Sequence, residues 1–348
     1  MKRSMQRWLA AAAALICPVV IAGCSGEGDP VTFGNNADNS PGNLGRNVGH
    51  QSAHTLPRLA HPKLLAQMPT GPAAAFTAER TVDDAVGTKI GVTTYHGRKS
   101  GFTGKVWVWA PPQYFQPQYA TKGFPVLIAL PGGPGYPNNY WYGPDLQLQE
   151  DISHWADTST SLPFILVMPV LNPDKQYHDC SDIPGMQKMG TWLTQDIPEL
   201  AKENFRTLRT RDGWGFMGSS SGGFCGLKSV LQYPDTFKAA IPSGPDIVPD
   251  SPLWRGNTAA MKANDPRYLA QQLIRKGGPD VYLGFQVGST EGYNMAKVQK
   301  FIDQYDQGPI HTRLQVIDGG RHTARSYIKG MAEGTMKWIS AHMRGPSH

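Results

Sequence analysis

Short apolar runs alternate with helix-like segments along most of this chain. Residues 126–130 (VLIAL) and 164–168 (FILVM) are continuously apolar, as expected for strands that are buried on both faces of a sheet. Residues 104–110 (GKVWVWA) alternate as a half-buried strand does, and two prolines end the run. Similar patterns predict further strands at 214–217, 239–241, 281–287 and 314–317, and helices at 192–205, 221–232 and 331–343.

Strands that alternate with helices predict a fold of the α/β class, with a mostly parallel central sheet covered by helices on both faces. In such sheets the ligand binds at the carboxyl ends of the strands. We therefore expect the functional residues to come directly after strands.

The N-terminal segment has a different pattern, which is typical of a targeting sequence. Residues 1–7 are positively charged, and residues 8–21 form an apolar stretch that is too short to span a bilayer comfortably. We expect residues 1–23 to be a signal peptide. Residues 21–24 (IAGC) resemble a bacterial lipobox, in which the cysteine, here Cys24, receives a diacylglyceryl group. The alternative is an ordinary signal peptide that ends next to a chance cysteine.

Lipidation of Cys24 would anchor the exported protein to the outer face of the bacterial cell membrane, because acyl chains bury many methylene groups in the bilayer. Residues 24–75 are rich in Gly, Asn, Pro and Ser, and this composition predicts a flexible tether. The folded domain is then expected at 76–345. No other segment is apolar for long enough to cross a membrane.

Charge and cysteine usage narrow the classes of function. The 348 residues suit one large domain, and the formal charge of +6 includes basic residues of the expected signal peptide. Because the chain has no run of Lys or Arg, we expect no nucleic-acid partner. After Cys17 leaves with the signal peptide and Cys24 is lipidated, Cys180 and Cys225 remain. Two cysteines in an exported domain usually pair, and two free thiols are the alternative.

The strongest candidate for chemistry follows the expected strand at 214–217. Residues 218–222 read Gly-Ser-Ser-Ser-Gly, which places a Gly-x-Ser-x-Gly motif between a strand and a helix. The chain must reverse sharply there, and glycines two residues to either side let strand and helix approach each other. Only Ser220 has glycines at both positions, so we predict Ser220 as a nucleophile lifted above the sheet. A Gly/Ser-rich surface loop is the alternative.

A serine hydroxyl needs an imidazole to take its proton, and the imidazole needs a carboxylate that holds its tautomer. In folds that carry this motif the chain order is Ser, then acid, then His. His322 follows the strand at 314–317 in a glycine-containing loop, whereas His311 precedes that strand and His342 lies in the closing helix. We therefore predict His322 as the general base.

The orienting acid is expected after a strand that comes shortly before the one carrying His322. Glu291 follows the strand at 281–287, which directly precedes that strand along the chain. We predict Glu291 as the acid. Asp246 and Asp250, which follow an earlier strand, are the alternatives.

A tetrahedral intermediate would also need N–H donors for its oxyanion. The backbone N–H of Ser221, the residue after the nucleophile, is expected to be one of them. The second should come from residues 131–135 (PGGPG), which follow an early strand. Since prolines have no N–H group, Gly132, Gly133 or Gly135 must donate, and we favour Gly133. A simple turn is the alternative for this loop.

Several segments together resemble the esterase D-like branch of the α/β-hydrolases, over most of the chain from about residue 88 onward. That branch includes feruloyl and acetyl xylan esterases, S-formylglutathione hydrolase, enterochelin esterase and the actinobacterial mycolyltransferase antigens. The segments that carry the resemblance are 106–112 followed by Tyr114, the helix at 191–198, the turn at 218–223 with the helix end at 233–237, and the loop at 319–322. The resemblance implies the α/β-hydrolase fold for residues 76–345.

In the mycolyltransferases the acid is a glutamate after the penultimate strand, which the resemblance transfers to Glu291. The chain is still more similar to secreted esterases of actinobacteria. In those proteins a cysteine after the nucleophile pairs with one before the 192-type helix, and Cys225 and Cys180 match that arrangement. Two departures are the loop at 131–135, which is richer in Gly and Pro than in mycolyltransferases, and Ser219, where many relatives have a bulkier residue.

These residues predict a secreted serine carboxylic-ester hydrolase that forms an acyl-enzyme on Ser220 and acts on a small-molecule, glycolipid or polysaccharide ester. The alternatives are an acyltransferase, in which a sugar or glycolipid hydroxyl replaces water, and a non-catalytic envelope lipoprotein. Residues 250–269 are expected to cap the site, where Trp254 either binds substrate or packs. No phosphate loop, nucleotide fingerprint or metal cluster is recognisable, so we expect neither a cofactor nor a metal.

Overall fold

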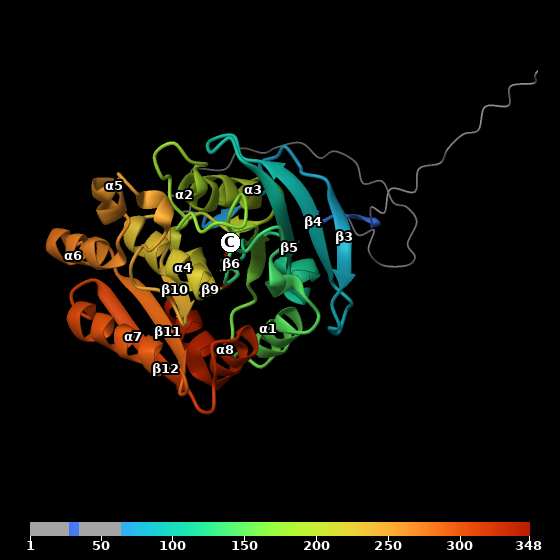
Figure 1. Ribbon diagram of the computed structural model, residues 1–348. Coiled ribbons are helices and arrows are strands. Elements are labelled where there is room, and N and C mark those ends of the chain that lie inside the picture. The colour runs from blue at the N-terminus through green and yellow to red at the C-terminus, as the bar shows by residue number, and fades with distance from the viewer. Residues whose placement is uncertain (1–27, 35–63) are drawn as a thin grey trace, which may run out of the picture.

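A ten-stranded sheet forms the centre of the computed structural model, which describes residues 28–34 and 64–348 (Figure 1). The last six strands in the order across the sheet run parallel to one another, and the first four form an antiparallel edge. The order across the sheet is β1 (Pro30–Val31), β3 (Phe76–Thr81), β4 (Lys89–His96), β5 (Thr103–Trp109), β7 (Ile165–Pro169), β6 (Val126–Leu130), β9 (Trp214–Ser219), β10 (Ala239–Ser243), β11 (Val281–Gly288) and β12 (Ile310–Ile317).

Helices cover both faces of this sheet, and each face has its own apolar cluster. The larger cluster lies under α3 (Ile197–Asn204), α4 (Ser221–Gln232), α6 (Pro266–Lys276) and α7 (Gly292–Tyr305). The second lies under α1 (Leu148–Asp157), α8 (Ala324–Gly330) and α9 (Met336–His342). Two shorter helices are α2 (Met189–Thr191) and α5 (Thr258–Ala263), and β2 (Ala66–Gln67) pairs with β8 (Thr207–Leu208) apart from the main sheet.

Strand β5 shows how the sequence builds these two clusters. Val106 and Val108 point into the larger cluster, and Trp107 and Trp109 point into the other, as the two-residue period of a strand requires. All four side chains are buried, so the alternation in this segment separates two apolar faces rather than an apolar face from a polar one.

The predicted strand at 126–130 and helix at 221–232 coincide with β6 and α4. Strand β12 begins at Ile310, four residues before the predicted start. It is the edge strand of the sheet, and His311, Thr312 and Arg313 are polar residues that are not buried, so no apolar pattern marks them. The predicted helix at 192–205 is divided, because a wide π-helical turn at 192–196 joins α2 to α3.

The tether that the composition predicts at 24–75 is corrected where the structure describes it. Strand β1 pairs with β3, with Val31 opposite Phe76, and β2 pairs with β8. Phe33 is buried and packs against Phe76 and Phe205, with ring centroids 5.3 and 4.9 Å away. The average composition of residues 24–75 gave no sign that Val31 and Phe33 are buried against the domain. Residues 28–34 and 64–75 therefore belong to the folded domain.

The predicted signal peptide at 1–23, the lipidation site Cys24 and the rest of the predicted tether at 25–27 and 35–63 lie outside the described residues. Within residues 28–34 and 64–348, none of the helices combines the length and apolar character needed to cross a bilayer.

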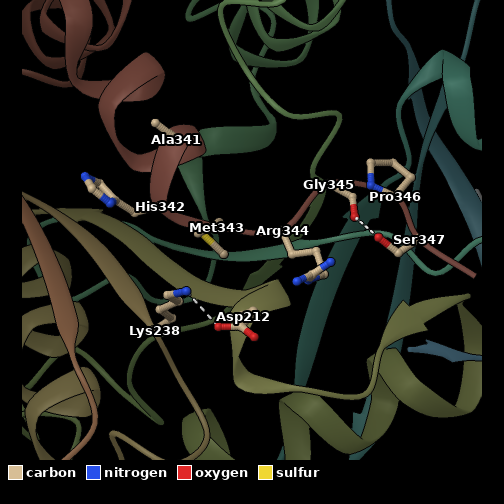
Figure 2. A pocket seen from close by; sticks show the side chains of 9 residues that line it. All are labelled: Asp212, Lys238, Ala341, His342, Met343, Arg344, Gly345, Pro346 and Ser347. Carbon is tan, nitrogen blue, oxygen red and sulfur yellow. Dashed lines mark hydrogen bonds and ion pairs between the residues drawn. The ribbon is translucent and has the colours of Figure 1, made fainter. Parts of the chain in front are cut away.

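A cavity of about 480 Å³ opens at the amino ends of the strands, beside the C-terminal residues 341–347 (Figure 2). Asp212 and Lys238, which precede β9 and β10, form an ion pair at 2.7 Å on its wall. His342 lines the same cavity and stacks on Tyr282 with ring centroids 4.0 Å apart. This edge is opposite to the carboxyl ends of the parallel strands β6, β7 and β9 to β12, so His342 does not lie at the edge where the functional residues are expected.

Candidate active site

Ser220 lies in a sharp turn between β9 and α4, with φ of 53° and ψ of −121°. Residues other than glycine rarely adopt this backbone conformation, and it persists only where the surrounding structure enforces it. The flanking glycines allow the close backbone approach that this turn requires. A β-carbon on Gly218 would lie 2.4 Å from the Gly222 carbonyl oxygen, and one on Gly222 would lie 2.3 Å from the Leu130 carbonyl oxygen. Ser220 is partly exposed, whereas Ser219 is buried.

His322 and Glu291 meet at the same carboxyl edge of the sheet. Glu291 directly precedes α7, just after β11, and His322 lies in the loop between β12 and α8. The imidazole Nδ1 is 2.6 Å from Glu291 Oε2. Because an ionised carboxylate can only accept, Nδ1 carries the proton, and Nε2 is left as the basic nitrogen.

Several groups hold the Glu291 carboxylate besides His322. The backbone N–H of Gly288 donates to Oε1 at 2.8 Å, Asn294 Nδ2 donates to Oε2 at 2.8 Å, and the Tyr327 hydroxyl lies 3.0 Å from both oxygens. Burial by itself raises the pKa of Glu291, but the hydrogen bonds from His322, Asn294, Gly288 and Tyr327 outweigh it and lower this pKa to about 2. Glu291 is therefore ionised at every physiological pH.

Ser220 and His322 both line a cavity of about 750 Å³. Among the described residues Ser220 Oγ forms no hydrogen bond with the imidazole, a contact that is often long in unliganded enzymes and tightens with substrate. Gly133, Tyr140 and Tyr327 line the same cavity. The structure thus brings the predicted nucleophile, base and acid to one site.

The loop after β6 supplies a second set of polar groups. The N–H of Gly132 donates to the Tyr140 hydroxyl at 2.6 Å, so it is already occupied. Gly133 has φ of 65° and lines the cavity, and its carbonyl accepts a 2.6 Å hydrogen bond from Ser221 Oγ. Within residues 28–34 and 64–348 the backbone N–H groups of Gly133 and Ser221 bond to no protein acceptor, which leaves both for an oxyanion.

A sequence-family model described as "Putative esterase" matches residues 102–338, about two thirds of the chain. The chain belongs to this esterase family. An uncharacterized protein of Corynebacterium glutamicum is 25% identical over 281 residues, which are 76% of this chain and 64% of the relative. The esterase chain therefore spans less than two thirds of the length of this curated relative.

Solved structures establish the α/β-hydrolase fold of the esterase. A ferulic acid esterase superposes with a TM-score of 0.57 and 15% identity, covering 74% of this chain and 98% of its own. A fluorophosphonate-binding serine hydrolase of Staphylococcus aureus superposes with a TM-score of 0.58 and 16% identity, covering 73% of this chain and 98% of its own. For the S-formylglutathione hydrolase of Agrobacterium tumefaciens the TM-score is 0.55 and the identity 17%, and the match covers 75% of this chain and 98% of that one.

Neither alternative acid of the esterase bonds to His322 among the described residues. Asp246 pairs with Lys297 at 2.7 Å, and Asp250 forms no ion pair or hydrogen bond with His322 among the described residues. Trp254 is only 3% exposed, and its indole N–H donates to Asp179 Oδ2 at 2.7 Å. It lines neither cavity at Ser220, so of the two roles that the sequence left open for Trp254, the structure favours packing.

The predicted cysteine pair is present as a disulfide between Cys180 and Cys225, whose Cα atoms are 5.7 Å apart. Lys228, fully buried three residues further along α4, donates to the carbonyl oxygens of Asp179 and Cys180 at 3.0 and 2.5 Å. Burial lowers the pKa of Lys228 to about 7. The helix that follows Ser220 therefore holds the 179–181 loop by a covalent bond and by hydrogen bonds.

Sequence reasoning missed Asn294, Tyr327 and Tyr140 in the esterase. Asn294 is three residues after Glu291, in the first turn of α7, and Tyr327 is five residues after His322, in α8, so each lies in the helix that directly follows a predicted site residue. That position is the signal that could have indicated them. Tyr140, whose hydroxyl contacts Gly132 N and Ser219 Oγ, carries no comparable signal.

Within residues 28–34 and 64–348 no three or more His, Cys, Asp or Glu side chains are grouped so that they could hold a metal ion.

Proposed function

We propose that this esterase is a serine carboxylic-ester hydrolase that works through an acyl-enzyme on Ser220. The observation that carries the proposal is the 2.6 Å contact between His322 Nδ1 and Glu291 Oε2 at the cavity that Ser220 lines. That contact leaves His322 Nε2 free to accept a proton, on the side of the ring away from Glu291. A small-molecule ester is the substrate class that the family supports.

In the first half-reaction Ser220 Oγ attacks the ester carbonyl carbon while His322 Nε2 takes the hydroxyl proton. Negative charge develops on the former carbonyl oxygen, and the backbone N–H groups of Gly133 and Ser221 are the donors that would receive it. His322 then gives its proton to the leaving alkoxide oxygen. The alcohol departs, and the acyl group stays on Ser220 as an ester.

The second half-reaction repeats these steps with water. His322 Nε2 takes a proton from a water molecule that attacks the acyl carbonyl, and it later returns that proton to Ser220 Oγ. Glu291 does not exchange protons in either half-reaction, because its pKa of about 2 keeps it ionised while the imidazole is charged. The products are one carboxylic acid and one alcohol.

The adjacent serines provide a matched test of this assignment. We expect Ser220→Ala to abolish hydrolysis of p-nitrophenyl acetate, while Ser219→Ala retains it, because Ser219 is buried and its hydroxyl bonds to Tyr140. Circular dichroism and thermal unfolding would show whether both variants fold. Full activity of Ser220→Ala, or loss of activity in Ser219→Ala alone, would contradict the proposal.

Hydrolysis and acyl transfer share the first half-reaction, and we propose that water is the natural acceptor. Product analysis with trehalose in excess separates the two. We expect the free acid to account for the released acyl group. An acylated sugar as the main product would instead identify an acyltransferase.

We propose further that the protein is exported and anchored by lipid on Cys24. The Cys180–Cys225 disulfide supports export, since disulfides persist mainly in oxidising compartments. Expressed in a bacterium supplied with labelled fatty acid, the wild-type chain should take up label and sediment with membranes. Cys24→Ser should take up none and appear in the soluble fraction, and an equal distribution of both chains would contradict the proposal.

A further inference from the structure

Two separate cavities meet at Ser220. The larger, of about 750 Å³, is lined by His322 and its neighbours Thr323 and Ala324, and by Gly133 from the loop after β6. The smaller, of about 240 Å³, is lined by Ser221 and by side chains from three other segments, and no histidine lines it. Ser220 therefore lies between two cavities, of which only the larger is lined by the proposed base His322.

The smaller cavity has a firm apolar wall and an acidic rim. Leu171 and Phe224 are buried, the Cys180–Cys225 disulfide lines it, and Val248 lines it from the loop after β10. Lys228 and the disulfide both hold the 179–181 loop, so this wall is fixed to the same helix that follows Ser220.

The geometry of a tetrahedral intermediate distributes the parts of an ester between these two cavities. Its carbon bears four groups, namely Ser220 Oγ, the oxyanion, the leaving oxygen and the acyl substituent. The oxyanion needs the N–H groups of Gly133 and Ser221, and the leaving oxygen needs the proton on His322. The alcohol must therefore lie in the cavity that His322 lines, and the direction left for the acyl substituent is the other side of Ser220.

We infer that the smaller cavity, which Val248 lines, receives the acyl group of the substrate, and that the larger cavity receives the alcohol. This inference rests on the proposed function and deepens it by naming the substrate class: esters of short, uncharged acids with bulky alcohols.

The volumes set the size of each part. Pockets that hold a whole drug-sized ligand usually have about 300–1,000 Å³, a range that includes the larger cavity and excludes the smaller. At about 30 Å³ for each water-sized unit, 240 Å³ admits on the order of eight such units. Butanoyl and hexanoyl groups fit this space, whereas a dodecanoyl chain does not.

Charge sets a second limit on the acyl group. Asp179, Asp246 and Asp250 line the smaller cavity, and Lys297 pairs with Asp246. Asp179 Oδ2 accepts hydrogen bonds from the backbone N–H of Asp250 at 3.1 Å, which ties this part of the wall together. Asp250 forms no ion pair among the described residues, and the nearby positive charge of Lys297 only partly offsets the negative charges of Asp250, Asp179 and Asp246. A carboxylate at the end of an acyl chain would meet like charges there.

A panel of p-nitrophenyl esters tests the size limit. We expect the wild-type enzyme to prefer butanoyl and hexanoyl over dodecanoyl esters. Val248→Trp should fill the smaller cavity and lower the hexanoyl-to-acetyl ratio of kcat/KM by about tenfold or more, whereas Val248→Ala should shift the preference toward longer chains. The matched control is Leu146→Trp, which places the same large side chain on the wall of the larger cavity and should leave that ratio as in the wild type.

Monosuccinyl and butanoyl esters of one alcohol test the charge limit at equal chain length. The wild type should favour butanoyl, and Asp250→Asn should narrow the difference severalfold, as should added salt. If Leu146→Trp instead of Val248→Trp shifts the acyl-length ratio, or if Asp250→Asn leaves the succinyl ratio unchanged, the assignment of the cavities is wrong while ester hydrolysis stands. A wild-type enzyme that hydrolyses none of these esters would overturn the proposed function itself.

Discussion

At the scale of single residues, the contact between Glu291 and His322 determines which imidazole nitrogen faces Ser220. Replacing Glu291 with Gln puts an amide N–H where a carboxylate oxygen accepts the Nδ1 proton, and the amide favours the wrong tautomer. We expect Glu291→Gln to lower kcat on the order of 10³- to 10⁴-fold, measured with p-nitrophenyl butanoate. Asp318→Asn, which removes an exposed carboxylate near His322 in sequence, should stay close to the wild type.

The same carboxylate links stability to pH. Its pKa is lowered from 4.5 to about 2 in the folded protein, so the unfolded chain binds a proton more readily than the folded one between these values. This contribution to stability is fully present above pH 4.5 and is lost as the pH falls toward 2. Urea unfolding at several pH values should therefore show a steeper acid loss in the wild type than in Glu291→Gln, and parallel curves would contradict this.

The residues of the proposed triad could be predicted because each of them follows a strand that the apolar pattern marks. Ser220 was identified by the glycines at −2 and +2, and the close backbone approaches at Gly218 and Gly222 show why no other residue fits there. The sequence favoured Gly133 as the second oxyanion donor but gave no physical reason to exclude Gly132. The choice between Gly132 and Gly133 depends on the hydroxyl of Tyr140, which reaches Gly132 only in the folded chain.

At the scale of elements, α4 joins the nucleophile to the wall of the smaller cavity. Its Cys225 closes a loop with a sequence separation of 45 residues, and a crosslink of that span contributes about 4 kcal/mol in the chain-entropy model. We expect the double variant Cys180→Ser, Cys225→Ser to lose about that much free energy of unfolding, measured with urea under oxidising conditions. Wild-type protein unfolded in the presence of a reducing agent is the control, and it should match the double variant.

Elements differed in how well their patterns predicted them. Strand β6 was located to the residue and β7 to within one residue, because both are apolar throughout and buried on both faces. The edge strand β12 and the amphipathic helices α7 and α8 mix buried and exposed positions, so the start of β12 was missed and neither helix was predicted. Glu291 and His322 could nevertheless be predicted as acid and base, because each lies shortly after a strand, β11 or β12, that the sequence indicates.

At the scale of the whole molecule, the hydrolase domain extends further toward the N-terminus than composition suggests. Phe33 packs between Phe76 and Phe205, and Gly91 of β4 leaves room for its ring, since a β-carbon there would lie 3.0 Å from it. We expect Phe33→Ala to lower the free energy of unfolding by about 3–5 kcal/mol. Leu64→Ala, at an exposed position, should change it little, and equal effects of the two variants would show that the segment is not part of the core.

The central claim is that one hydroxyl, on Ser220, becomes acylated. The most direct measurement is to label the full-length protein with a fluorophosphonate, digest it and locate the adduct by tandem mass spectrometry. We predict a single stoichiometric adduct on Ser220 that disappears in Ser220→Ala and forms far more slowly in a His322→Ala variant. An adduct on Ser219 or Ser221, or undiminished labelling of Ser220→Ala, would contradict the account.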